Sequence, residues 1–302
     1  MKRSITNILF KEWEWVLASC PGSFDDILQK DLSILTWDIH ESTKFNYADP
    51  HVTEIGGKSY IFCEKISKIY KKGEIEYISE DEFHNEDTRN FKKFLREPYH
   101  LSFPIVNSID EEYLITCESS EADGLIGWKF DDDFNVNEKL SLINKPLIDP
   151  VIFSTNDTYY LLGSIRIKKQ EYKFTVHYST DLKNWKEIPP RDIKTSSQSS
   201  RNAGGFIFSD REIYRLSQIL EPSYGSGIEI NRIVSLSRSE YIEEKVKEIR
   251  PVDIVSGKYD GLHTLTASKN KIYVDLRYSK IDLFAFPKKI IRRIRKYLYL
   301  PK

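Results

Sequence analysis

Two aspartates, each followed directly by proline, stand at matching places in a repeated pattern of this chain: Asp49 before Pro50, and Asp149 before Pro150. Two carboxyl groups across one pocket are the minimum for cleaving or transferring a glycosyl group, because one protonates the leaving oxygen while the other activates water or attacks the sugar. Their pKa values must be pushed apart for the two roles to differ. The proline predicts an extended backbone at each aspartate. The alternative is that each carboxylate only caps a turn where a strand begins.

Other polar side chains stand at related places in the repeats. Glu118 ends an apolar strand of the second repeat and Glu64 ends the corresponding strand of the first, where an acid points either into a central channel or out to solvent. Glu118 is the favoured pocket residue of the two. Arg201 and Asn202 precede Gly204, which permits close approach of a ligand, and arginine binds carboxylate or phosphate through paired hydrogen bonds. The alternative for Arg201 is a structural salt bridge.

Further candidates come from the fourth and fifth repeats. Arg215 and Gln218 lie on the same repeat as Arg201, and Tyr224 offers a ring suited to stacking on a sugar face. His263 begins the fifth repeat, where a functional imidazole competes with the more ordinary structural one. The sequence holds no GxxxxGK[ST], GxSxG or HExxH motif, so we expect no nucleotide fold, no dedicated metal site and no cofactor.

These residues belong to five copies of one short pattern, and the repeat decides how they are positioned. Each copy starts with an apolar strand signal, an apolar run containing a tyrosine follows about ten residues later, and the copies recur roughly every 50 residues. The copies begin at Asp49, Phe103, Asp149, Asn202 and Gly261. This pattern predicts an all-β fold: a five-bladed β-propeller over residues 1–286, with a short basic C-terminal helix over 287–302.

A propeller would bring the candidates together, because the innermost strand of each blade lines a central channel and these strands begin at one mouth of it. Asp49, Phe103, Asp149, Arg201 or Asn202, and His263 would then share one pocket. Residues 11–20 predict a first strand, which by propeller architecture would complete the last blade and close the ring.

Composition limits the alternatives. Apolar residues make up 40% of the 302 residues, and strand-favouring tyrosine and phenylalanine number 18 and 16. A net charge of −1 argues against nucleic-acid binding, which needs an excess of cations. Cys20, Cys63 and Cys117 lack zinc-ligand spacing, which favours buried thiols and a reducing compartment. Because the N-terminal apolar stretch is too short for a signal peptide and no run of ~18 apolar residues occurs, we expect a cytoplasmic protein.

The C-terminal segment is basic and amphipathic. Ile290, Ile291, Ile294, Tyr297 and Leu298 follow helical spacing, with lysines and arginines between them. Such a helix is suited to an anionic membrane surface, which would place the protein peripherally at the inner face of the membrane. The alternative is a helix packed under the propeller with its basic face in solvent.

A set of short motifs, taken in order over residues 45–278, resembles the N-terminal domain of plant glucosamine inositolphosphorylceramide transferases and its bacterial relatives. Those relatives occur alone or joined to formyltransferase-type domains in surface-polysaccharide loci. The motifs are Ala48-Asp49-Pro50-His51, Tyr99-His100-Leu101-Ser102-Phe103-Pro104, Glu118-Ser119-Ser120, Ile148-Asp149-Pro150, Ser200-Arg201-Asn202-Ala203-Gly204, Tyr214-Arg215-Leu216-Ser217-Gln218, Tyr224-Gly225 and Gly261-Leu262-His263-Thr264.

The resemblance implies a further similarity to the five-bladed propellers of arabinanases, levansucrases and invertases, in which one aspartate is base or nucleophile, a second tunes or orients, and a glutamate is the acid. By position Asp49 and Asp149 match the first two roles. Where family 43 hydrolases place the acid before Gly-Pro, this chain has Arg201-Asn202-Ala203-Gly204, and Glu118 is the candidate to replace that acid. In the plant proteins the glycosyltransferase fold lies in a separate C-terminal domain, which we do not expect in this chain.

The resemblance also extends the set of candidate ligand-binding residues. Together these are His51, His100, Arg201, Asn202, Arg215, Gln218, Tyr224 and His263. The first hypothesis is a carbohydrate-active propeller that acts on a sugar or sugar-lipid intermediate of surface-glycan biosynthesis, by acid–base glycosyl cleavage or transfer. The second is a non-catalytic glycan-binding module that presents substrate to partner glycan-biosynthesis enzymes. The third is a scaffold held at the membrane by the terminal helix.

Overall fold

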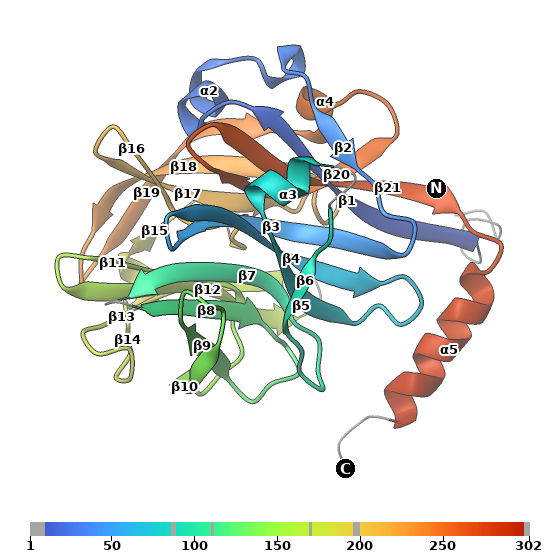
Figure 1. Ribbon diagram of the computed structural model, residues 1–302. Coiled ribbons are helices and arrows are strands. Elements are labelled where there is room, and N and C mark those ends of the chain that lie inside the picture. Colours follow the sequence, from blue (N-terminus) through green and yellow to red (C-terminus); the bar gives the residue numbers. More distant parts are fainter. Residues whose placement is uncertain (1–9, 86–88, 110–111, 169–170, 196–199, 299–302) are drawn as a thin grey trace.

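The computed structural model describes residues 10–85, 89–109, 112–168, 171–195 and 200–298. Residues 1–9 of the predicted propeller and residues 299–302 of the predicted C-terminal helix lie outside the described residues. The described strands form five sheets arranged around one axis (Figure 1), which confirms the all-β, five-bladed β-propeller.

Each blade is a twisted sheet built mainly from antiparallel neighbours in the chain. The first two blades contain β3 (Phe45–Ile55), β4 (Lys58–Ser67), β5 (Gly73–Ser79) and β6 (Lys92–Leu95), and then β7 (Ser102–Ile109), β8 (Glu112–Glu118), β9 (Leu125–Phe130) and β10 (Val136–Ile143). The third and fourth contain β11 (Ile148–Thr155), β12 (Thr158–Lys168), β13 (Glu171–Ser179) and β14 (Lys186–Glu187), and then β15 (Ile193–Lys194), β16 (Ile207–Ser209), β17 (Glu212–Ile219), β18 (Gly227–Leu236) and β19 (Tyr241–Ile249).

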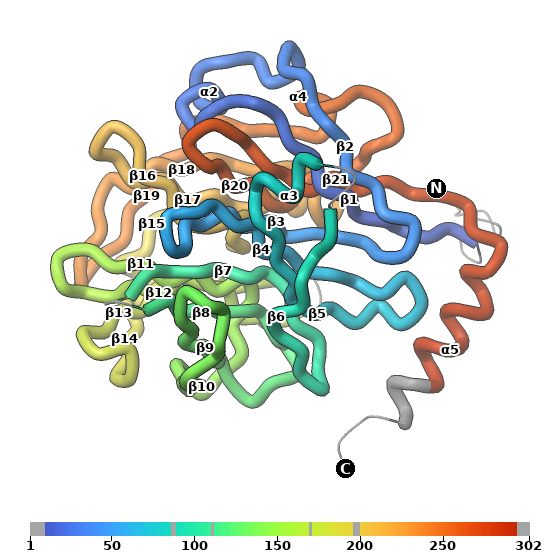
Figure 2. Tube along the Cα trace, viewed as in Figure 1, coloured from blue at the N-terminus to red at the C-terminus, as the bar shows by residue number. Residues whose placement is uncertain are grey.

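The fifth blade closes the ring, because it takes strands from both ends of the chain. It contains β20 (Tyr259–Ala267), β21 (Lys271–Ile281), β1 (Lys11–Pro21) and β2 (Asp38–His40). β1 pairs with β21 over its whole length, from Lys11 opposite Ile281 to Pro21 opposite Lys271. Figure 2 shows β1, in blue, beside β21, in red. The prediction that residues 11–20 form a strand completing the last blade is confirmed.

Short helices connect the strands, and apolar side chains fill the space between neighbouring blades. The helices are α2 (Phe24–Gln29), α3 (Glu80–His84), α4 (Pro251–Ile254) and the 3-10 turns η1 (Leu32–Ile34) and η2 (Pro190–Asp192). The largest apolar cluster lies between the fourth and fifth blades and includes Leu216, Ile230 and Leu262. Cys20, Cys63 and Cys117 are buried and free, which confirms the interpretation of buried thiols.

The inner strands of the first three blades share an irregularity that corrects one prediction. Asp49, Phe103 and Asp149, each before proline, have φ of +51°, +51° and +47°, and the register of each inner strand shifts there. The extended backbone expected from the following proline is therefore wrong. A bulge with a left-handed residue turns that residue out of the ladder, and its strain is offset by hydrogen bonds between blades. The amide N–H of Phe103 donates to Asp49 Oδ2 at 3.0 Å, for example.

The C-terminal helix α5 (Ala285–Leu298) extends away from the propeller body (Figures 1 and 2). Its cations reach back to the propeller: Arg292 Nη1 lies 3.0 Å from Glu12, and Lys289 Nζ donates to the carbonyl of Lys11. Its apolar residues Ile290, Ile291 and Ile294 are exposed. The alternative of an apolar face packed on the propeller and a basic face in solvent is therefore wrong for the described side chains. α5 is too short to cross a bilayer, and so is every other helix in the described ranges.

Candidate functional site

A cavity of about 350 Å³ opens at the mouth of the channel where the inner strands begin. Its wall combines carboxylates, cations, imidazoles and aromatic rings. The lining residues are Trp13, Trp15, Asn46, Ala48, Asp49, Glu64, Ile66, Lys71, His100, Ser102, Glu118, Asp149, Arg201, Tyr224 and His263. All five blades contribute, so the ring closure assembles this set from positions far apart in the sequence.

The cavity brings together seven of the candidate residues and leaves four outside its lining. Those on the wall are Asp49, His100, Glu118, Asp149, Arg201, Tyr224 and His263, and Glu64 joins them. His51 does not line the cavity, and its Nε2 lies 3.2 Å from the carbonyl of Val106. Burial lowers the pKa of His51 to about 4. At the fourth blade it is Arg201, and not Asn202, that lines the cavity. Phe103 contributes its amide while its ring packs in the core.

Asn202, Arg215 and Gln218 form a buried layer behind the wall. The amide group of Asn202 donates to the carbonyl of Asp149 at 2.7 Å, and Arg215 Nη1 donates to Asn202 Oδ1 at 2.9 Å. The Arg215 guanidinium also makes a two-point ion pair with Glu243, at 2.5 and 2.7 Å. Gln218 Nε2 donates to Asp149 Oδ2 at 3.0 Å. These side chains fix the position of Asp149 and do not face the cavity.

Asp149 and Arg201 form a buried two-point ion pair. Arg201 Nε lies 2.6 Å from Oδ2 of Asp149 and Nη2 lies 2.9 Å from Oδ1. Burial raises the pKa of Asp149 to about 7 and Arg201 opposes this shift, while Asp149 in turn raises the pKa of Arg201. The raised pKa of Asp149 favours a neutral acid, whereas the raised pKa of Arg201 requires a charged Asp149 beside it. Because Arg201 and Gln218 present only N–H donors to it, the geometry favours the carboxylate.

Glu118 lies beside this ion pair and is the least constrained acid of the three predicted ones. Its Oε2 is 3.4 Å from Arg201 Nη2 and accepts from the amide of Asp149 at 3.3 Å, which leaves Oε1 for a ligand. The side chain retains 14% exposure, against 3% for Asp149 and 7% for Asp49. Glu118 is therefore placed to exchange a proton with a ligand in the cavity.

Asp49 is a second buried acid that lines the cavity. Its Oδ1 accepts from the hydroxyl of Thr264 at 2.8 Å and its Oδ2 accepts from the amide of Phe103 at 3.0 Å. Burial raises the pKa of Asp49 to about 7, while His263 opposes the rise and Glu64 adds to it. A carboxyl group that titrates near neutral pH suits acid–base chemistry, so Asp49 has the environment that a general base requires.

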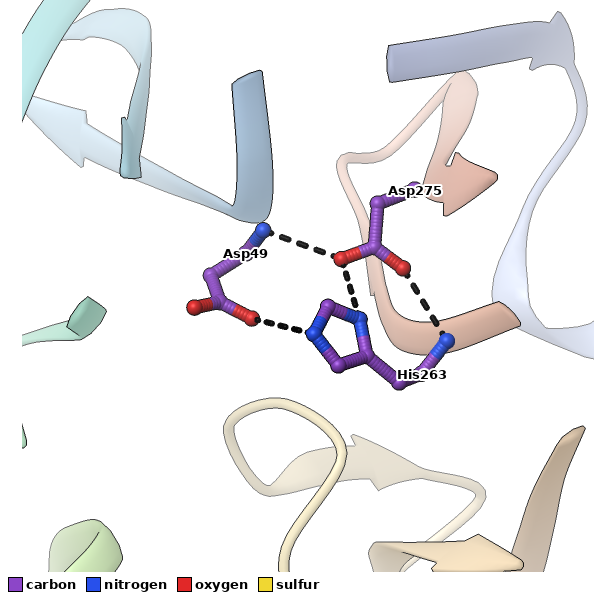
Figure 3. Close-up of side chains that lie close together, drawn as sticks. All are labelled: Asp49, His263 and Asp275. Atoms are coloured by element: carbon purple, nitrogen blue, oxygen red, sulfur yellow. Dashed lines mark hydrogen bonds and ion pairs between the residues drawn. The ribbon is translucent and has the colours of Figure 1, made fainter. Parts of the chain in front are cut away.

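Sequence reasoning missed Asp275, which lies behind His263 in the second strand of the fifth blade. Figure 3 shows Asp49, His263 and Asp275 side by side, with atoms of a metal-binding type within 4.8 Å of one another. Those atoms already have partners: Asp275 alone accepts from three amides and lies 2.5 Å from His263 Nδ1. Hydrogen-bond donors fill the positions that a cation would need, so the group fits a hydrogen-bonded array better than a metal centre. A polar residue in the apolar run Tyr273-Val274-Asp275 was the signal that could have found it.

Sequence reasoning predicted Tyr224 in the aromatic part of the wall but missed Trp13 and Trp15. Trp15 stacks on His263 with ring centroids 3.9 Å apart, and the ring of Tyr224 meets Trp15 edge-on. Trp13 also lines the cavity, and 42% of its surface is exposed. Alternation along β1 places both tryptophans on one face of the strand, and this period of two was visible in the sequence. Aromatic rings and carboxylates in one cavity wall form a surface suited to sugars, since rings cover apolar C–H groups while acids bind hydroxyl groups.

Comparison with known proteins places the chain beside one family of sequences. A family model described as glucosamine inositolphosphorylceramide transferase 1, N-terminal, matches residues 35–261. Glucosamine inositolphosphorylceramide transferase 1 of Arabidopsis thaliana is 30% identical over 208 residues, which are 66% of this chain and 27% of that protein. The chain therefore spans about a quarter of the length of this curated relative.

Solved structures share the fold at low sequence identity. An exo-1,5-α-L-arabinanase from a bovine ruminal metagenomic library has a TM-score of 0.52 at 13% identity and covers 81% of this chain and 95% of its own. A family 117 glycoside hydrolase from Zobellia galactanivorans has a TM-score of 0.51 at 12% identity, with 91% and 92% covered. The predicted similarity to arabinanase-type five-bladed propellers is confirmed at the level of the fold.

Proposed function

The chain belongs to the family of the N-terminal region of glucosamine inositolphosphorylceramide transferase 1, and from this premise we propose that its channel-mouth cavity binds and processes a sugar. The substrate class is a sugar or sugar-lipid intermediate of surface-glycan biosynthesis, and the reaction is acid–base glycosyl cleavage or transfer. Asp49 acts as base or nucleophile, Glu118 as acid, and Asp149 as the group that orients them through Arg201.

One observation carries this proposal: Asp49, Glu118 and Asp149 line a single cavity together with Trp13 and Trp15. The three acids have different environments, one buried beside an imidazole, one partly exposed, and one held by a guanidinium. Distinct partners and exposures distinguish the three carboxyl groups, and separate acid and base roles require such distinct environments. The transferase among the similar sequences and the glycoside hydrolases among the similar structures support the proposed reaction class. They do not identify the sugar.

A second candidate, a non-catalytic glycan-binding module that serves partner glycan enzymes, is favoured by a different observation. Asp149 is saturated by Arg201 and Gln218, and Asp49 receives Thr264 and Phe103. In this alternative the two aspartates are structural, the more exposed groups of the cavity wall bind sugar hydroxyl groups, and no glycosidic bond is made or broken.

A glycan array compares two exposed aromatic side chains as a matched pair. We expect Trp13→Ala to weaken binding of any glycan that the wild-type protein retains by about 30-fold, as for an aromatic anchor worth ~2 kcal/mol. Phe208→Ala is the control, because Phe208 is 61% exposed and lines a separate cavity of about 170 Å³. Asp49→Ala and Asp149→Ala should lose binding as well. If the wild type retains no glycan, or the two aromatic variants bind equally, the sugar site is disproved.

We also propose a cytoplasmic location with peripheral contact between residues 287–302 and an anionic membrane. The support is a set of exposed apolar residues on and just before α5, with Arg293 exposed among them: Ile281, Leu283, Phe284, Phe286, Ile290, Ile291 and Ile294. Apolar residues beside cations are the combination that inserts into the headgroup region. Part of the basic charge is already paired with the propeller, so we expect the apolar residues to contribute most of the binding.

Co-sedimentation with phosphatidylserine-containing vesicles measures this contact. The full chain should bind at least about tenfold more than a chain ending at Phe286, and Ile290→Ser with Ile294→Ser should reproduce most of that loss. Lys289→Gln should reduce binding less, because Lys289 is directed toward the carbonyl of Lys11. Equal sedimentation of the full and shortened chains would remove the membrane proposal and leave the sugar site untouched.

A further inference from the structure

Asp275 is a fully buried carboxyl group that does not line the cavity, and three backbone amides donate to it. It accepts from the amides of Asp49, His263 and Thr264, each at 3.0 Å, and lies 2.5 Å from Nδ1 of His263. A protonated Asp275 could instead donate to a lone pair on Nδ1, but three amide N–H donors favour the carboxylate. Against a carboxylate at 2.5 Å, Nδ1 of His263 carries a hydrogen in either charge state of the ring.

The other ring nitrogen of His263 faces Asp49, with Nε2 3.5 Å from Oδ1 (Figure 3). If Nε2 has a lone pair, Asp49 must carry the proton for the two atoms to attract. If Nε2 carries a hydrogen, Asp49 must be the carboxylate. A single proton between these two atoms satisfies both arrangements, and the two acids and the ring then hold a net charge of −1 in either case.

The surroundings hold the ring in this orientation. Trp15 stacks on one face with 16° between the planes, and Tyr224 meets the ring edge-on at 5.2 Å. The charged groups that act on His263 are Asp275 from β21, Asp49 from β3 and Arg201 from the segment before β16. Burial opposes the charged ring, whereas Asp275 and Asp49 favour it and raise its pKa.

We propose that Asp275, His263 and Asp49 form a proton relay that opens into the cavity, with Asp275 as a positioning residue that fixes the ring tautomer. The step begins after the shared proton has left to solvent, so that Nε2 has its lone pair, Asp49 is the carboxylate and the group holds a net charge of −2. Asp49 then takes a proton from a ligand hydroxyl group or a water and passes it to Nε2. The O–H bond of the donor breaks, an N–H bond forms, and the donor oxygen keeps the electron pair. The imidazolium is balanced by Asp275, and Asp49 returns to the carboxylate. The catalytic use of this relay rests on the proposed function, but the relay itself exists without a ligand.

The test is therefore made on the free full-length protein, by long-range ¹H–¹⁵N NMR of the ring nitrogens of its six histidines. His263→Gln assigns the signal. We expect wild-type His263 to titrate above the ordinary midpoint of ~6.5 and to keep its hydrogen on Nδ1 when neutral. Asp275→Asn should lower the midpoint by about one unit or more and move the neutral hydrogen to Nε2, because the asparagine amide donates to Nδ1.

Asp49→Asn separates the relay from a merely structural role of Asp275. It should lower the midpoint of His263 while the hydrogen stays on Nδ1, and it covers the case in which Asp275→Asn fails to fold. His100→Gln, a change at a second histidine of the same cavity, should leave both readouts unchanged. A neutral wild-type ring with its hydrogen on Nε2, or a midpoint that Asp49→Asn does not move, overturns the relay. Neither result depends on whether a glycan binds, so failure of the sugar site is recognised separately on the array.

Discussion

Replacing Asp49 with asparagine is expected to slow glycosyl cleavage or transfer by about 10²–10⁴-fold while ligand affinity changes by only a few fold. Asparagine keeps the size of the side chain and still accepts from the amide of Phe103, but it cannot take up a proton. The assay is mass spectrometry of products released from, or added to, glycans that the wild-type protein retains.

The pH dependence of the wild-type rate provides a second readout of the same residue. A general base acts as the carboxylate, and the pKa of Asp49 is raised to about 7, first by burial and further by Glu64. The rate should therefore rise as pH increases through about 7 and level off above it. This acidic limb should be absent from the residual rate of Asp49→Asn.

Asp157→Asn is the matched control for this substitution. Asp157 also has a left-handed backbone, with φ of +53°, but it lies exposed in the turn between β11 and β12. Its replacement should leave the rate unchanged. An Asp49→Asn variant that turns over at the wild-type rate would exclude Asp49 as base. A wild-type protein that binds glycans and yields no product would establish the binding-module alternative instead.

Replacing Arg201 with methionine is expected to lower the free energy of unfolding by about 3–5 kcal/mol, because it leaves the carboxylate of Asp149 buried without its partner. The change also removes the contact of Arg201 with Glu118 and its packing over Tyr224. Urea denaturation at neutral pH measures the loss. Arg232→Met is the matched control: Arg232 belongs to the same blade and pairs with Glu244, but at an exposed site where ion pairs contribute at most ~1 kcal/mol.

The cost of Arg201→Met should depend on pH in a defined direction. Without the guanidinium, the folded-state pKa of Asp149 moves further above its unfolded value, so the folded state binds protons more tightly. Stability then falls as pH rises, and the variant should be closer to the wild type at pH 5 than at pH 8. Adding Asp149→Asn should recover part of the loss, since asparagine tolerates a left-handed backbone. Equal costs for Arg201→Met and Arg232→Met would mean that the buried pair does not support the fold.

The number of blades and the strand that closes the ring could both be predicted from the repeat pattern of the sequence. Blade identity is a local property, because each copy carries its own apolar alternation, turn residues and tyrosine, and the pattern recurs whether or not the copies touch. The Trp13–Trp15 alternation of β1 is a local signal of the same kind. The two Asp-Pro pairs also located the acids, since equivalent positions in repeats occupy equivalent positions around a ring.

Which side chains face the cavity, and which charge state their surroundings favour, depends on contacts between distant parts of the folded chain. The amide of Asp49 meets Asp275 across 226 positions of sequence, and no local pattern specifies such a contact. The left-handed backbone at Asp49 and Asp149 defies the local preference of a residue before proline, because hydrogen bonds from neighbouring blades offset its strain. Contacts from other strands also decide that Arg201 rather than Asn202 reaches the cavity: Asp149 binds the Arg201 side chain, and Gln218 donates to the carbonyl of Asn202. Burial and long-range partners set these features, and both exist only once the ring has closed.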